Sequence, residues 1–125
     1  MGAALKAFAE HRPRVYAASD VRHDLFQRYL TTTADQSFDL VYTHGATVEL
    51  VHPSFDVIRH LCRIARDHVV LLIHEYELGY PRFWALEFAL RGFLLTRALR
   101  PVDQDLQNQP LSAASLLVFR RLPRS

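Results

Sequence analysis

The chain has 125 residues, half of them hydrophobic and 22% charged, which suits a single globular domain. Its net charge is only +2, and its arginines alternate with acids along the sequence. This argues against nucleic-acid binding, because such proteins gather basic residues on one face. A single cysteine excludes an internal disulfide, and no signal sequence or apolar run of about 20 residues is present. We therefore expect a cytoplasmic protein without a membrane span.

The first part of the chain predicts a helix, a strand and a second helix. Residues 3–11 have a helical pattern that Pro13 ends, because the residue before a proline avoids the helical region. Residues 14–18 (Arg-Val-Tyr-Ala-Ala) predict a strand, and Asp20 after them is a good helix N-cap. Apolar residues within 21–30 recur at helical spacing, which predicts the second helix.

The middle of the chain predicts another strand, helix and strand. Residues 38–43 (Phe-Asp-Leu-Val-Tyr-Thr) form the strand, and Pro53 begins a helix that runs to about residue 67. Residues 69–73 are five consecutive aliphatic side chains. Such a run is typical of a strand buried on both faces of a parallel sheet.

The last part predicts one helix and two strands. The helix lies between Pro81 and Gly92, and the strands cover residues 93–96 and 115–120. No helix separates these two strands, so they can pair antiparallel. The alternation along the whole chain predicts an α/β fold, with a mostly parallel sheet of about five strands flanked by helices and an antiparallel last strand.

From residue 38 onward, the order of these segments resembles the second half of class I S-adenosylmethionine-dependent methyltransferases. The matching pieces are FDLV at 38–41, the loop YTHG at 42–45, LCRIAR at 61–66, VVLLI at 69–73, GFLLT at 92–96 and LLVF at 116–119. The resemblance covers roughly residues 38 to 121. It implies a Rossmann-like fold, S-adenosylmethionine as cofactor, and methyl transfer to an unknown acceptor.

The glycine-rich cofactor loop of that family has no counterpart in this chain, whose four glycines are far apart. The resemblance therefore implies one truncated methyltransferase-like domain over residues 1–125, without the first two strands. Strand 14–18 would fill the vacant place beside strand 38–43. Alternatively, that edge stays exposed, to be covered by a second copy or by a partner chain. The chain is then either an incomplete methyltransferase or a non-catalytic remnant or partner subunit that acts through protein–protein contact.

Ligands of open parallel sheets bind beyond the carboxyl ends of the strands. By the resemblance, Asp20, Thr43 and Gly45 would contact the cofactor, and His44 would act as a base. Each has a structural alternative, since Asp20 also suits a helix N-cap and His44 a polar loop. Glu49 and His52 belong to the same loop as His44, and for each of them a functional role and a structural role are both possible interpretations.

The segment after strand 69–73 is a second candidate region. By the resemblance, Glu75, Tyr80 and Arg82 would contact the substrate, with Tyr80 and Arg82 exposed beside a buried aromatic cluster. Glu75 equally suits a structural role at the end of the strand. The seven histidines and the cysteine lack the compact spacing of zinc ligands, so no metal is expected.

Overall fold

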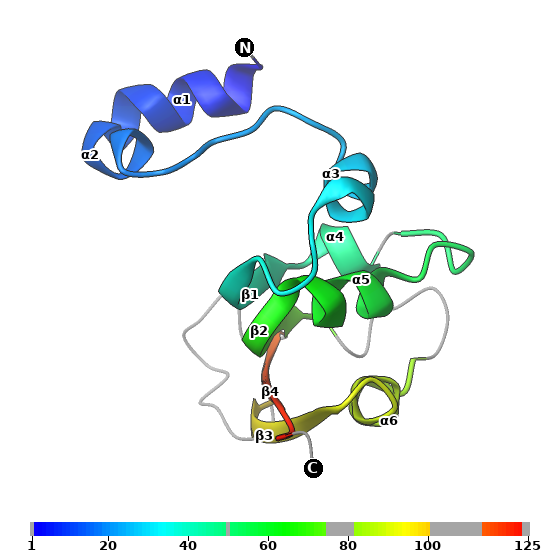
Figure 1. Cartoon of the computed structure of the whole chain (residues 1–125). Coiled ribbons are helices and arrows are strands. Elements are labelled where there is room, and N and C mark those ends of the chain that lie inside the picture. The colour runs from blue at the N-terminus through cyan, green and yellow to red at the C-terminus, as the bar shows by residue number, and fades with distance from the viewer. Residues whose placement is uncertain (1, 50, 75–81, 101–113, 124–125) are drawn as a thin grey trace.

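The computed structural model describes residues 2–49, 51–74, 82–100 and 114–123 (Figure 1). Within these ranges the chain forms six helices and four strands. The helices are α1 (Ala3–His11), α2 (Pro13–Ala17), α3 (Phe26–Thr32), α4 (Ala46–Glu49), α5 (Val57–Ile64) and α6 (Trp84–Ala89). The strands are β1 (Phe38–His44), β2 (Ala65–Ile73), β3 (Phe93–Leu99) and β4 (Ser115–Arg121).

The four strands form one mixed sheet in the order β1-β2-β4-β3. β1 and β2 are parallel, whereas β4 pairs antiparallel with both β2 and β3. The predicted antiparallel last strand and its pairing with the strand before it are confirmed. The prediction of about five strands in a mostly parallel sheet is wrong for the described residues. Four strands are present, and two of their three pairings are antiparallel.

The missing fifth strand is the one predicted over residues 14–18, which lie in and directly after helix α2. Pro13 occupies the first turn of this helix, where its missing N–H costs nothing and its fixed φ favours the helical conformation. A strand here would need a neighbouring strand to satisfy its backbone groups, whereas a helix satisfies its own. The hypothesis that this segment lies beside β1 is therefore wrong, and β1 is at the edge of the sheet that the described strands form.

The remaining predicted elements are present, most of them with shifted ends. α1 has the predicted bounds, while α3 begins at Phe26, later than predicted. α5 is shorter than predicted, because Asp56 caps its start by accepting a hydrogen bond from the Arg59 N–H at 3.1 Å. It ends early because the chain passes directly into β2 at Ala65.

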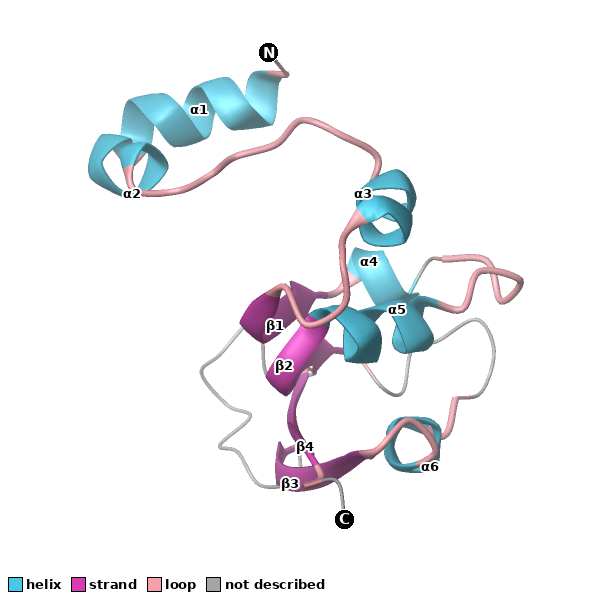
Figure 2. Cartoon of the chain, in the orientation of Figure 1, coloured by secondary structure: helices cyan, strands magenta, loops and turns pink. Residues whose placement is uncertain are grey.

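Helices α4, α5 and α6 pack with the sheet around one core, which covers a single face of the sheet (Figure 2). The Phe88 ring of α6 stacks on the Phe119 ring of β4, with 3.9 Å between their centroids. The core includes Val48, Val57, Ile58, Leu61, Val69, Leu71, Ile73, Phe88, Phe93, Leu117 and Phe119. On the other face, Leu40 and Tyr42 of β1 and Leu94 of β3 are about half exposed.

Helices α1 and α2 form an N-terminal arm, residues 2–17, that stands away from the sheet (Figure 1). Phe8 of α1 contacts Tyr16 of α2, with ring centroids 5.4 Å apart, but neither helix contains a buried residue. In the described ranges, no helix has the length and apolar character needed to cross a membrane.

Candidate functional site

The carboxyl ends of the parallel strands β1 and β2 form the first part of the candidate site. β1 ends with Thr43, which is only 8% exposed, and His44, which is exposed. Gly45 follows with φ of +60°, a conformation that favours glycine, and its N–H donates to the Leu72 carbonyl of β2 at 2.8 Å. This bond fixes the turn that leads from β1 into α4.

Glu49, the last residue of α4, reaches back to the end of β2. Its Oε1 accepts a hydrogen bond from the main-chain N–H of His74 at 2.5 Å and lies 3.1 Å from Nδ1 of the His74 ring. The two side chains are 16% and 29% exposed. A carboxylate that holds Nδ1–H of an imidazole leaves Nε2 as a proton acceptor. Nε2 of His74 can therefore accept a proton at the carboxyl ends of β1 and β2.

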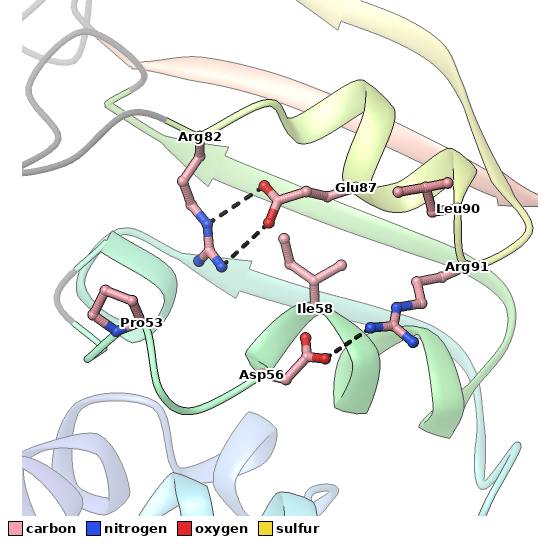
Figure 3. A pocket seen from close by; sticks show the side chains of 7 residues that line it. All are labelled: Pro53, Asp56, Ile58, Arg82, Glu87, Leu90 and Arg91. Atoms are coloured by element: carbon pink, nitrogen blue, oxygen red, sulfur yellow. Dashed lines mark hydrogen bonds and ion pairs between the residues drawn. The ribbon is translucent and has the colours of Figure 1, made fainter.

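A pocket of about 490 Å³ lies between α5 and α6, the helices that pack with the core face of the sheet (Figure 3). Arg82 projects from the segment before α6 toward Glu87, with Nε 3.5 Å from Oε2, and Arg91 contacts Asp56 at 2.8 Å. The lining residues are Pro53, Asp56, Ile58, Arg82, Glu87, Leu90 and Arg91. Pockets of this size bind small molecules. Because two cations and two carboxylates lie beside apolar side chains here, the pocket suits a small polar ligand.

Arg82 was predicted to be exposed, but its side chain is only 9% exposed. The guanidinium lies over the Trp84 ring, 5.2 Å from the centroid, and Glu87 balances its charge. Arg82 lines the pocket, and its predicted contact with a substrate stays a prediction.

Two buried donors lack hydrogen-bond partners within the part of the chain that the structure describes. They are Nε1 of Trp84, at the start of α6, and Oγ of Ser115, opposite Ile73 at the end of β2. Buried polar atoms without partners are rare in folded proteins and often mark a place for water or a ligand. Ser115 therefore adds a polar atom at the end of β2.

The structure does not bring Asp20 to this edge. It lies in the segment between α2 and α3, where its side chain is 77% exposed and pairs with Arg22 at 2.9 Å. The hydrogen bond and the charge of Arg22 lower the pKa of the Asp20 carboxyl. The predicted contact with a cofactor rested on a strand ending at residue 18, and that strand is a helix.

The other predicted residues are placed as follows. His44 and Gly45 lie at the end of β1, whereas Glu75 and Tyr80 lie outside the described residues. His52 is exposed, and its Nδ1 accepts the Ser54 N–H at 3.1 Å, so it supports the local turn. Sequence reasoning missed the role of His74. Its position directly after a buried strand was the only available signal.

S-adenosylmethionine carries an ammonium group, a sulfonium and ribose hydroxyls, all of which suit a carboxylate. Oε2 of Glu49 lies near Gly45, where a Cβ would stand 3.8 Å from this oxygen, an ordinary van der Waals distance. The chemistry of the Glu49 carboxylate suits the positively charged part of such a molecule, although its side chain is only 16% exposed. In the described ranges, no group of three potential metal ligands is present.

No known protein family matches the chain, and no curated protein matches it in sequence. Among solved structures, it is similar to a protein of Thermus thermophilus that carries the provisional name DNA modification methylase. The TM-score is 0.47 and the sequence identity 13%, over 79% of this chain and 50% of that protein. The chain thus spans about half the length of that protein, and function has to be argued from the site itself.

Proposed function

We propose that the chain takes part in S-adenosylmethionine-dependent methyl transfer to an unidentified acceptor and forms one wall of the cofactor and acceptor site. The observation that carries this proposal is the Glu49–His74 pair beside Gly45, at the carboxyl ends of β1 and β2. This is the edge of an α/β sheet where ligands bind. The sequence resemblance from residue 38 onward supports the same reaction class.

In this proposal the cofactor supplies an electrophilic methyl group, and the chain positions the groups that react. Glu49 holds the His74 ring through Nδ1, and Nε2 of His74 accepts the proton that the acceptor loses. His44, exposed at the end of β1, is the alternative base. Most of the rate acceleration would come from holding the reactants together.

The pocket between α5 and α6 is the proposed acceptor site. Arg82 and Arg91 can bind an acidic or carbonyl group, while Glu87 and Asp56 can accept hydrogen bonds. Ile58 and Leu90 supply an apolar surface beside them. These side chains favour a small polar acceptor over an extended macromolecule.

Calorimetric titration with S-adenosylmethionine tests the proposal. We expect saturable binding to the wild-type chain, weakened by a factor of roughly 10 to 100 by Glu49→Gln, because a charge-assisted hydrogen bond is worth about 1.5–3 kcal/mol. Asp67→Asn, near the start of β2 and at the opposite end of the strand from His74, is the matched control and should bind as the wild type does. Absence of binding to a chain shown to be folded would overturn the proposal.

The second candidate is a non-catalytic partner subunit that acts through protein–protein contact. The observation that favours it is the outer edge of β1, which pairs with no other described strand, together with the three exposed large apolar side chains of β1. If the folded chain binds neither S-adenosylmethionine nor its demethylated product, this second function becomes the better account.

A further inference from the structure

Strand β1 lies at the edge of the sheet and, among the described strands, pairs only with β2. Its side chains Phe38, Leu40 and Tyr42 are 40%, 53% and 54% exposed. Natural proteins protect edge strands with charged residues, prolines, bulges or a covering element, because an open edge is a template for another strand. β1 contains neither proline nor lysine, and its one acidic residue, Asp39, forms an ion pair with Arg66 of β2, so the apolar part of this edge is open to such pairing.

The outward backbone groups of β1 belong to alternate residues. Gly45 donates its N–H to the Leu72 carbonyl of β2, so the odd-numbered residues of this parallel ladder face β2. The N–H and C=O groups of Leu40, Tyr42 and His44 therefore face away from the sheet. No hydrogen bond from the described part of the chain reaches them.

A groove of about 290 Å³ follows the same edge, between β1 and α3. Its lining is almost wholly apolar and consists of Phe26, Tyr29, Leu30, Phe38, Leu40, Val41, Tyr42, Thr43, Leu61 and Ile64. A strand laid along β1 would thus gain hydrophobic contacts as well as main-chain hydrogen bonds.

We infer that β1 pairs with β1 of a second copy of this chain, antiparallel, about a two-fold axis through Val41. The four strands of each copy would then form one continuous sheet. A two-fold contact uses the same surface of both copies, so the strand has to be complementary to itself. The sequence of β1 meets this condition in one register.

The outward backbone groups of one copy can bond only to the outward groups of the other copy. Even-numbered residues therefore face even-numbered residues, which requires the two-fold axis to pass through a residue and not between two residues. An axis at Leu40 or Tyr42 leaves one end of the strand unpaired, whereas an axis at Val41 pairs all seven residues. In that register no like charges face each other, and apolar side chains meet across the axis. The opposed pairs are Phe38–His44, Asp39–Thr43 and Leu40–Tyr42, each formed twice.

Light scattering coupled to size-exclusion chromatography tests the inference. We expect the wild type to elute at twice the chain mass of 14.4 kDa, and Leu40→Lys/Tyr42→Lys at the mass of one chain. Both side chains are about half exposed, and circular dichroism will show that the variant folds. Leu94→Lys, on the strand at the other edge, is the matched control and should remain dimeric.

A wild type that is monomeric at its highest soluble concentration would overturn the inference. So would a dimer that persists in the Leu40→Lys/Tyr42→Lys variant, or one that dissociates equally in Leu94→Lys. Neither outcome depends on S-adenosylmethionine binding, so this inference and the proposed function can fail separately.

Oxidative crosslinking tests the register. Val41→Cys should form a disulfide-linked dimer, because directly opposed residues lie within disulfide distance across the axis. Tyr42→Cys should not, since Tyr42 faces Leu40 in this register. The native Cys62 is buried and supplies the background for both variants. Crosslinking of Tyr42→Cys in place of Val41→Cys would contradict the proposed axis.

Discussion

Arg63 joins two elements that are far apart in the sequence. Its guanidinium, on α5, donates to the main-chain carbonyls of Leu30 and Thr33, at 2.5 and 2.6 Å, and contacts the Asp35 carboxylate at 2.8 Å. These carbonyls belong to the end of α3, where no further helical N–H is available. The Arg63 side chain, 22% exposed, thus fixes α3 against the body of the domain.

Replacement of Arg63 by alanine removes these bonds and leaves helix-end carbonyls without a donor. We expect a loss of about 2–3 kcal/mol in the free energy of unfolding, measured by urea denaturation. Arg59→Ala is the control, because Arg59 is 53% exposed and lies 3.8 Å from its partner Asp56. Its loss should stay below about 1 kcal/mol. Equal losses in the two variants would contradict the role assigned to Arg63.

Burial raises the pKa of the Cys62 thiol from its ordinary 9.0 to about 12. The folded chain therefore keeps this proton at pH values where the unfolded chain loses it. Stability should be independent of this group below pH 9 and should fall as the pH rises from 9 toward 12, by about 1.4 kcal/mol per pH unit.

Urea denaturation of the wild type and of Cys62→Ala at several alkaline pH values measures this effect. The difference in pH dependence between the two proteins isolates the thiol. A Cys62→Ala variant that loses stability as steeply as the wild type would show that other groups cause the fall.

At the scale of elements, local patterns predicted most of the fold. The aliphatic run 69–73 predicted β2, although the strand begins at Ala65, because the chain enters it directly from α5. The error at residues 14–18 has a different cause. Val15 and Tyr16 favour a strand, but the segment pairs with no described strand, and Pro13 starts a helix equally well. Strand pairing is a tertiary property that a short segment does not encode.

The N-terminal arm adds little to the stability of the domain, since neither α1 nor α2 contains a buried residue. Removal of residues 1–25 should therefore change the free energy of unfolding by less than about 1 kcal/mol, measured by thermal and urea denaturation. Removal of residues 1–32 is the control, because it also deletes the buried Leu30 of α3. A large loss in the shorter deletion would show that the arm packs on the domain.

For the whole molecule, the sequence predicted a site at the carboxyl ends of the strands, where the proposed site lies, but it did not predict the contact between Glu49 and His74. His44 and Gly45 could be located because the predicted strand 38–43 ends directly before them, and in the structure His44 is the last residue of β1. The contact between Glu49 and His74 joins residues 25 positions apart and depends on the turn that returns α4 to the end of β2. Asp20 was assigned to the same edge through a strand that does not form. Long-range contacts of this kind require the sheet topology.

The measurement that tests the proposed site most directly is NMR titration of the isotope-labelled chain with S-adenosylmethionine. We expect the amide signals of Gly45, Glu49 and His74 to shift most, while those of Arg66 and Asp67 at the start of β2 stay in place. Unchanged spectra at millimolar cofactor, or shifts centred on the N-terminal arm and the segment with Asp20 and Arg22 that follows it, would contradict this expectation.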